Sequence, residues 1–451
     1  MYEDTDSQGV WAFKHPMMQE VAYRSMLSEH RRALHRTVAA EQQKCYPDPN
    51  GAQATLIAYH WEEAGDTMQA IDSSMKAAAW YGTGDVAHPV EWDKVRDPAH
   101  ALDAWKRVHR LLAMVSLDWA AQQQLLVACG QVINFGWREG LSAVDLKPYY
   151  VEALELARSL GHTRAIVLLN AGYGRALAAS GSADNYLALA NETLSMFDSA
   201  EHVSLAVLLT AVRCHAHVLV GDLRAALADN DYVLGNLHRV EEGDAQALTY
   251  DPFVWMKYMR GRILTTMGRY EDARPLLEEL IAGNEATVNA GHRLRAHLSM
   301  INIAFGLADQ TLAGAHGSAA RRLARSNRTP FFKRTSRICT GLELFLRREH
   351  GKAMAIFSHV FQNIRNPGLE GVAIVLCHLA HAQLRAGLLD ASRVTAEQAA
   401  DLARRYGHKV SLTYAVWLLE GPNSPTFRKL IKETGAEHYV RLRHPRHARR
   451  N

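Results

Sequence analysis

A three-position pattern of residues recurs along this chain and constrains its fold more than any other feature. Each copy has a residue that is small, a turn residue seven positions later and, five positions after that, a residue that is small in all copies but one. Two packed antiparallel helices need small residues where their backbones cross, and a residue between them that tolerates positive φ. The pattern therefore predicts an array of helical hairpins, a kind of fold that usually binds other proteins and rarely catalyses. The copies are Ala58/Gly65/Ala70, Gly174/Gly181/Tyr186, Cys214/Gly221/Ala226, Gly261/Gly268/Ala273, Gly341/Arg348/Ala353 and Ala380/Gly387/Ser392.

The spacing of the copies indicates a longer unit than the standard tetratricopeptide repeat. Gly181 and Gly221 are 40 residues apart, and Gly221 and Gly268 are 47 apart, whereas a standard tetratricopeptide repeat has about 34 residues. The larger gaps on either side predict further repeats that have lost the pattern. We expect an all-α fold, a tetratricopeptide-like helical-hairpin superhelix with a small N-terminal winged-helix remnant.

Composition fits a helical protein with a buried core. Apolar residues make up 48% of the 451 residues and charged residues 22%, which is ordinary for a globular chain. The net charge of +4 creates no strong global attraction to nucleic acid or membrane. We take the longest apolar stretch to lie around Leu298 to Ala308, too short for the ~20 residues of a membrane span. The five scattered cysteines and the polar start MYEDTDSQG predict reduced thiols and a cytoplasmic location.

Breaks in the helical pattern divide the chain into three predicted regions. Residues 1–46 form a partial winged helix, 47–420 the repeat array, and 421–451 a terminal helix with a basic tail that we expect to fray. In the first region we expect a short strand at Val10–His15, with Pro16 opening a helix and Ser28 capping the next one. Apart from the pair around Gly65, the helices predicted before the turn at Gly181 are 16–26, 28–43, 99–115, 119–136, 145–160 and 163–180.

The segment from Phe13 to His35, FKHPMMQEVAYRSMLSEHRRALH, resembles the end of the winged-helix region in bacterial STAND-type signalling ATPases. The same layout occurs in class III adenylyl cyclases with an internal ATPase module. The following YHWEEAGDTMQAI resembles the first repeat of those proteins. The residues that carry the resemblance are Phe13, His15, Glu20, Val21, Ala22, Tyr23, Leu27, Arg31, Arg32, Leu34 and His35, then His60, Trp61, Glu63, Ala64, Gly65 and Ala70.

The catalytic parts of that family are missing from this sequence. No GxxxxGK[ST] phosphate loop occurs, and the GTGD at residues 82–85 lacks the lysine and the strand–loop–helix frame of one. The resemblance therefore implies a C-terminal region that begins within a winged helix. It implies a non-catalytic sensor or scaffold that receives a signal from a protein partner, such as an upstream ATPase or cyclase module. The alternatives are a subunit or fragment of an ATP-dependent cyclase or ATPase, with His15 as the only nameable nucleotide contact, and a transcription regulator.

Three other groups of residues have both a functional and a structural interpretation. We favour the structural interpretation for each group. His378 and His381 lie beside Cys377, but no HExxH, CxxC or carboxylate-rich partner is near. Glu62, Glu63 and Asp66 read as a solvated helix end. We predict no catalytic residue, metal or cofactor, and we hold nucleic-acid binding unlikely. The basic residues considered for that binding are Arg321, Arg322, Arg325, Arg328, Lys333, Arg334, Arg337, Arg441, Arg443, Arg446, Arg449 and Arg450.

One repeat position gives the candidate partner-binding residues. In a tetratricopeptide-type hairpin, the residue just after the small position of the first helix faces the concave side. Aromatic and basic side chains dominate this set, as in protein-binding surfaces. We expect a concave binding face, the alternative being a position that is merely exposed. The residues are Tyr59, Arg175, His215, Arg262, Leu342 and His381.

Overall fold

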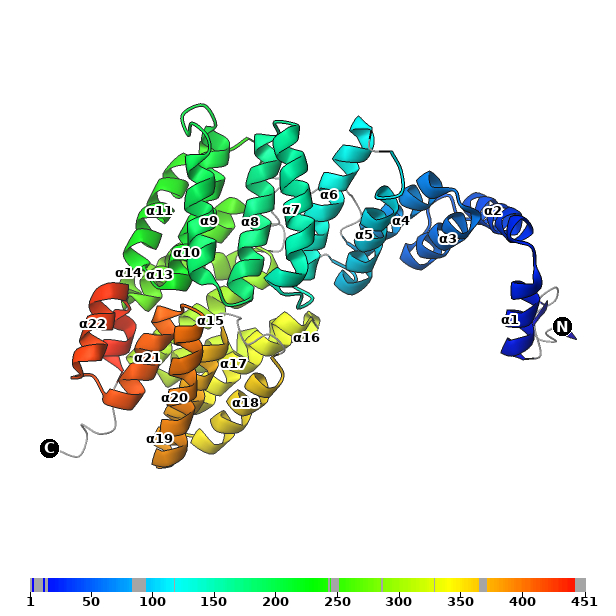
Figure 1. The fold of residues 1–451 in the computed structure, drawn as a ribbon. Helices are drawn as coiled ribbons and strands as arrows, with labels where there is room; N and C mark the ends of the chain where they lie inside the picture. The colour runs from blue at the N-terminus through cyan, green and yellow to red at the C-terminus, as the bar shows by residue number, and fades with distance from the viewer. Residues whose placement is uncertain are drawn as a thin grey trace. The chain divides into compact units, whose positions relative to one another are not determined.

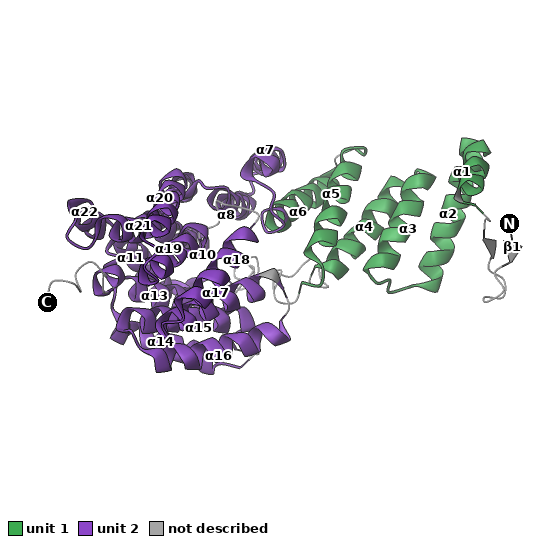
Figure 2. Cartoon of the chain, turned by 90° about the horizontal axis from the view of Figure 1, so that it is seen from below, with its two compact units in different colours: residues 1–87, 95–135 green, residues 88–94, 136–451 purple. Residues whose placement is uncertain are grey.

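The chain folds into paired α-helices preceded by a short β-ladder. The computed structural model describes residues 2–3, 11–12, 15–82, 95–116, 118–241, 244, 251–284, 287–327, 329–364 and 371–442. It divides into two compact units, coloured in Figure 2: residues 1–87 with 95–135, and residues 88–94 with 136–451. The division therefore falls near Gly136, and the helices before and after the predicted boundary at residues 46–47 share one unit.

The first unit holds the N-terminal helices and the first repeat pair. Tyr2–Glu3 pairs antiparallel with Trp11–Ala12, so the predicted strand has a partner within residues 1–9. The second helix, α2, packs directly on α3, as one more member of the helix stack; the winged-helix interpretation of residues 1–46 stays a prediction. The elements are β1 (Tyr2–Glu3), β2 (Trp11–Ala12), α1 (Pro16–Ser25), α2 (Ser28–Cys45), α3 (Gly51–Ala64), α4 (Thr67–Tyr81), α5 (Pro98–Leu112) and α6 (Trp119–Gly136).

The second unit holds the remaining helices, which follow one another as hairpins (Figure 1). They are α7 (Ala143–Ser159), α8 (Thr163–Ala179), α9 (Ala183–Ser195), α10 (Val203–Val220), α11 (Leu223–Asn236), η1 (Leu237–Arg239), α13 (Pro252–Thr266), α14 (Tyr270–Ala282), α15 (Ala290–Leu307), α16 (Gln310–Ser326), α17 (Pro330–Leu346), α18 (His350–Gln362), α19 (Gly371–Arg385), α20 (Leu389–Arg405), α21 (Lys409–Glu420), α22 (Pro425–Thr434) and η2 (Glu437–Arg441).

The repeat pattern is confirmed at every predicted turn. All of its turn residues have positive φ, including the non-glycine Arg348 at 63°. The small residues are buried where helices cross: a Cβ on Gly261 would approach Leu277 to 2.7 Å, and one on Gly341 would approach Phe357 to 2.6 Å. In the copy whose third residue is large, the ring of Tyr186 occupies the space over Gly174. The turn residues are Gly65, Gly181, Gly221, Gly268, Arg348 and Gly387.

The gap between Gly268 and Arg348 holds a further repeat, as expected from its length, although the pattern did not locate its turn. Helices α15 and α16 form a pair around Ala308, which has φ 57°. The equivalent residue seven positions earlier is Ile301, which is fully buried but not small. The pattern search failed here because neither the crossing residue nor the turn residue is of the expected type.

The first helices of successive pairs form an inner layer in the second unit. Each of α10, α13, α15, α17, α19 and α21 packs against the next one, and the second helices cover them. We call these six the first-helix layer. Their side chains are buried on most sides: α10 and α15 each contribute long runs of buried residues, whereas the second helices keep an exposed stripe.

The layer closes on itself because the C-terminal helices return to the earlier turns. Helix α21 packs against α10, and η2 packs against α13, α15 and α21. Tyr270 at the start of α14 hydrogen-bonds to His438 Nδ1 at 2.7 Å, and the guanidinium of Arg441 lies 4.9 Å from the ring centre of Tyr270. Arg224 on α11 donates to the carbonyl of Lys432 at 2.8 Å. The closure thus joins segments about 200 residues apart in the sequence.

Three sequence expectations are corrected by the structure. Ser28 is the first residue of α2 and makes no cap; the N-cap is Leu27. Arg441 and Leu442, expected in a frayed tail, are packed against the closure, and Leu442 is buried; residues 443–451 lie outside the described part. Among the described residues, one helix, α10 at Val203–Val220, is long and apolar enough to cross a membrane, but 78% of that window is buried within the fold. A core helix passes the same test.

The closure predicts unequal costs for two similar glycine substitutions. Gly181 and Gly387 both have positive φ, but a Cβ on Gly181 would fall inside the ring of Tyr406, whereas nothing lies within 4 Å of one on Gly387. Gly387→Ala should cost only the left-handed backbone strain, about 1–2 kcal/mol. Gly181→Ala should cost about 1–3 kcal/mol more because it overpacks the contact. Urea unfolding of both variants measures the difference; equal costs would mean that the turn of α8 and α9 does not contact α20 as described.

Candidate functional site

Basic and aromatic side chains from several first helices meet on one face of the second unit. Trp255 and Arg262 lie on the same face of α13, seven residues apart. The ring of His215 on α10 meets Trp255 edge-on, with ring centres 5.7 Å apart. Arg295 on α15 lies 5.8 Å from the ring centre of Trp255. We call Arg175, His215, Trp255, Arg262 and Arg295 the inner-face cluster; all five side chains are half-buried.

The charges of three arginines act on the His215 ring. Burial, and then the charges of Arg262, Arg175 and Arg295, lower the pKa of His215 to about 3. The imidazole is therefore neutral at pH 7, and the cations near it are the three arginines. Arg262 also helps to lower the pKa of the buried His408, after burial itself.

The other face of α13 contrasts with this arrangement. Lys257 pairs with Glu279 on α14, and Arg260 pairs with Asp231 on α11. These pairs connect α13 to the helices that cover it. Lys257 and Arg260 thus join α13 to the helices that cover it, whereas Arg262 lies in the inner-face cluster.

The predicted partner-binding residues are divided by the structure into three groups. Arg175, His215 and Arg262 come together in the inner-face cluster. Tyr59 belongs to the first unit, is 41% exposed, and meets His35 edge-on at 5.8 Å. What these four residues bind stays a prediction.

His381 and Leu342 are corrected: both are buried between helices, so neither is available to a partner. His381 is 2% exposed and its Nδ1 hydrogen-bonds to the Tyr414 hydroxyl at 2.7 Å, while Leu342 is fully buried. The rings of Tyr414 and Trp417 on α21 lie against His381, and α17, which carries Leu342, packs against α15, α16, α18 and α19. A sequence pattern within one repeat contains no information about the side chains that other repeats place over it.

Trp255, Arg295 and His292 are the site residues that sequence reasoning missed. Trp255 and Arg295 hold equivalent positions in neighbouring repeats, each six residues before the crossing residue (Gly261 and Ile301). Sampling a single position per helix could not find them. Reading the same helix face one or two turns further toward its N-terminus would have done so.

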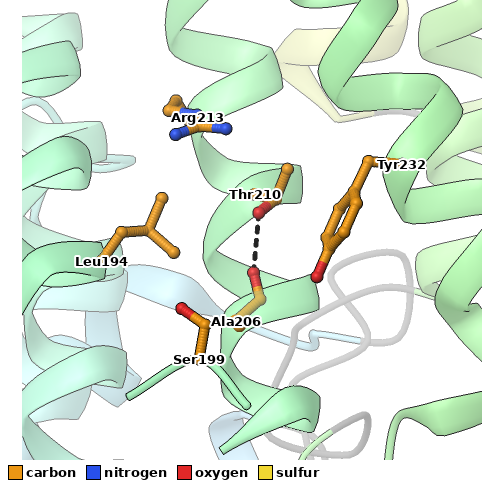
Figure 3. Close-up of a pocket in the computed structure, with 6 residues that line it drawn as sticks. All are labelled: Leu194, Ser199, Ala206, Thr210, Arg213 and Tyr232. Carbon is orange, nitrogen blue, oxygen red and sulfur yellow. Dashed lines mark hydrogen bonds between the residues drawn. The ribbon is translucent and has the colours of Figure 1, made fainter. Parts of the chain in front are cut away.

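A pocket of about 230 Å³ lies away from this cluster, between α9, α10 and α11 (Figure 3). Two of its polar side chains are already engaged: the Thr210 hydroxyl donates to the Ala206 carbonyl, and Arg213 donates to both carboxylate oxygens of Asp229 at 2.6 and 2.9 Å. Arg213 is two residues from His215 and so points to the opposite side of α10. We do not place the site here. The pocket is lined by Leu194, Ser199, Ala206, Thr210, Arg213 and Tyr232.

The histidine–cysteine group around Cys377 lies inside the core. Cys377 is fully buried and burial raises the pKa of its thiol, so no reactive thiolate forms at neutral pH. His378 is 7% exposed, and burial lowers its pKa to about 3. This group packs the first-helix layer, as the structural interpretation predicted.

The acidic residues of the first pair join helices. Glu62 on α3 accepts hydrogen bonds from Arg107 and Arg110 on α5 at 2.8 and 2.7 Å. Asp66 pairs with Arg36 on α2 at 2.6 Å. The interpretation as a freely solvated helix end is therefore wrong for Glu62 and Asp66, which connect three helices.

The basic stretch of α16 and α17 is partly internal. Arg321 and Arg347 both pair with the buried Glu343, at 2.6 and 2.7 Å. Burial lowers the pKa of Arg334. Arg328 and the tail arginines after Arg441 lie outside the described residues. The described part of this stretch thus does not present a continuous basic surface.

Comparisons with known proteins assign no family to this chain. No family model matches the chain, and no curated protein matches it. Among solved structures, the crystal structure of yeast Tom70 is similar with a TM-score of 0.42 and 12% identity, covering 92% of each chain. Similarity this low transfers no site or activity.

The buried histidines predict a stability that falls in acid. The pKa of His215, His292 and His378 is lowered to about 3, and that of His438 to about 4, first by burial. The unfolded chain takes up these protons near pH 6.5, and the folded chain resists doing so. Stability is therefore complete above pH 6.5 and declines as pH falls toward 4, by about 2 kcal/mol per histidine at pH 5.

Thermal unfolding between pH 7.5 and 4.5 checks this prediction. His378→Met should reduce the dependence on pH, because its ring has a buried Nδ1 without a hydrogen-bond partner in the described structure. His100→Gln, at an exposed position, is the control and should leave the dependence unchanged. An identical pH profile for His378→Met and the unmodified chain would contradict the assignment.

Proposed function

We propose that this protein is a non-catalytic scaffold that binds another protein through the inner-face cluster of its second unit. The observation that carries the proposal is the convergence of Arg175, His215, Trp255, Arg262 and Arg295 from four helices onto one half-buried face. Arginine and tryptophan are the residues that most often dominate binding energy in protein interfaces.

The resemblance to STAND-type ATPases and adenylyl cyclases supports a more specific proposal. The residues that carry it form a contact network across the first three helices: the Tyr23 hydroxyl lies 2.9 Å from His35 Nε2, and His35 Nδ1 lies 2.8 Å from His60 Nδ1. The same hydroxyl donates to Glu63 at 3.4 Å. In this proposal the network couples the N-terminal helices to the repeats of a cytoplasmic signalling protein, where a partner shifts the balance between two arrangements.

Peptide display on the immobilised full chain tests the scaffold proposal. We expect random twelve-residue peptides to yield binders that lose at least tenfold in affinity with Arg262→Glu. Arg393→Glu is the matched control, since Arg393 is an exposed arginine on α20 with Glu397 as its partner. Binders that Arg262→Glu and Arg393→Glu affect equally, or a selection without binders, would remove the inner-face cluster as the binding surface.

Calorimetry with ATP and Mg²⁺ tests the alternative, in which the chain is part of an ATP-dependent cyclase or ATPase. We expect no heat of binding at millimolar nucleotide. His15, the one nucleotide contact named from the sequence, is an exposed residue that precedes α1 and makes no side-chain cap. Micromolar binding that His15→Ala weakens would favour the enzyme-subunit proposal over the scaffold.

A further inference from the structure

We propose that the first unit pairs with a second copy of this chain through an exposed side of helix α2, with the two α2 helices antiparallel about a twofold axis. The inference goes beyond the proposed function, which concerns the second unit. Two features of the described residues support it. Helix α2 has an uncovered apolar side, and the residues on that side are complementary to themselves in apolar character and in charge.

Helix α2 has apolar residues on two sides, and the described helices cover one of them. It is the outermost helix of the stack α2 to α6 in the first unit (Figure 2), and α3 packs along it. His35 and Ala39 are buried on the covered side. The other side starts just before the helix and exposes 80% of Leu27, 44% of Leu34 and 39% of Val38. An array of helices needs a polar outer face to stay soluble, so an apolar one indicates a contact.

The uncovered side continues along the whole helix as one line of residues. Their separations alternate between four and three positions, which is the spacing of the contact residues in a coiled coil. Two apolar residues form the middle, a basic and an acidic residue flank them, and an apolar residue and an exposed cysteine are at the ends. We call this line the α2 seam; its residues are Leu27, Arg31, Leu34, Val38, Glu41 and Cys45.

The α2 seam is complementary to itself when two copies run antiparallel. If the twofold axis passes at the level of Arg36, residues equally distant from position 36 lie level in the two helices. Leu34 then meets Val38 of the second copy, two residues from the axis. Arg31 meets Glu41 of the second copy, five residues from the axis. Each contact occurs twice, so an ion pair closes the apolar centre at both ends. A parallel pair would place like charges together, which disfavours it.

The local contacts of the two charged residues are compatible with this pairing. The guanidinium of Arg31 lies 5.3 Å from the ring centre of Tyr23, a contact that holds the arginine in place and lowers the entropic cost of binding. Glu41 pairs with Lys44 of the same helix at 2.6 Å, and both side chains are more than half exposed. Such a surface pair contributes at most about 1 kcal/mol, so it does not prevent a second contact to Glu41.

Exposed side chains on α3 extend the surface beside the α2 seam. The ring of Tyr59 meets that of His35 edge-on, so Tyr59 lies alongside α2. Leu56, three residues earlier and on the same face of α3, is also exposed. Stable protein interfaces bury about 1,200–2,000 Å² in total, which is more than a single helix pair supplies. In this proposal α3 of each copy adds to the contact, and the second copy is the partner of Tyr59.

Sedimentation equilibrium of the full chain tests the pairing. We expect a dimer at micromolar concentration. Arg31→Glu and Glu41→Arg each place like charges opposite one another, so each should weaken the dimer at least tenfold. The double variant restores opposite charges and should recover most of the affinity. Arg393→Glu, at an exposed position on α20, is the control and should leave the dimer unchanged.

A disulfide cross-link tests the antiparallel register. Leu27 and Cys45 are level in the two copies of the proposed dimer, nine residues from the axis, whereas within one chain the 18 residues between them span about 27 Å. We expect Leu27→Cys to form a covalent dimer with the native Cys45 when diamide is added. The other cysteines are buried. Ala33→Cys, on another side of α2, and Leu27→Cys combined with Cys45→Ser are controls that should give no covalent dimer.

Four outcomes would overturn the inference. They are a chain that stays monomeric at hundred-micromolar concentration, single charge variants that dimerise as the unmodified chain does, a double variant without recovery, and a dimer that Leu27→Cys does not cross-link. Circular dichroism shows whether each variant folds, and if a charge variant does not, the cross-link carries the test. Peptide display on the inner-face cluster concerns another surface, so either proposal can fail while the other stands.

Discussion

The helical hairpin with a left-handed turn residue is the unit on which the rest of the structure depends. In each of the six pairs that follow the pattern, one residue with positive φ reverses the chain, and a small residue lets two helices cross closely. Gly174 illustrates how strict this spacing is, because the ring of Tyr186 lies against its Cα. Since each pair buries an apolar stripe against its neighbour, the array is held together by contacts between successive pairs.

The closure adds contacts that a simple array lacks. The turns at Gly181, Gly221 and Gly268 serve their own hairpins and also receive the C-terminal segments that contain Tyr406, Lys409 and His438. Glycine is therefore required at these turns for two reasons: it adopts the positive φ of the turn, and it has no side chain to collide with the C-terminal segment. Linking the two ends of the second unit makes its stability less local than in an open array, because the loss of one contact affects helices that are remote in sequence.

Closure also separates the titratable groups into two environments. His378 and His438 are sealed in the layer, where burial keeps them neutral. Arg175, Arg262 and Arg295 remain half-buried on the inner face, where a partner can still reach them. A surface of arginine and aromatic side chains that closely packed helices support is preorganised, and preorganisation reduces the entropic cost of binding.

The sequence by itself determined the local structure. Its pattern located the turns at Gly65 through Gly387, because positive φ and close helix crossing each demand particular residue types at fixed spacing. It also placed the boundaries of α6 and α8 to within a residue or so. It predicted a further repeat in the gap after Gly268 but did not locate its turn at Ala308, where tertiary packing accepts Ile301 and an alanine turn in place of a small residue and glycine.

Only the tertiary structure decided which predicted site residues remain accessible. Arg262 and His381 occupy the same position in their repeats, and yet one lies on the half-buried face and the other is sealed under Tyr414. His381 is covered by Tyr414 and Trp417 of the next first helix, α21, and by Phe305 of α15, two first helices earlier. A periodic pattern describes the residues of one repeat, whereas the path of a superhelix accumulates small rotations over many repeats. The side chains that cover each repeat, and the meeting of α21 with α10, are therefore properties of the whole fold.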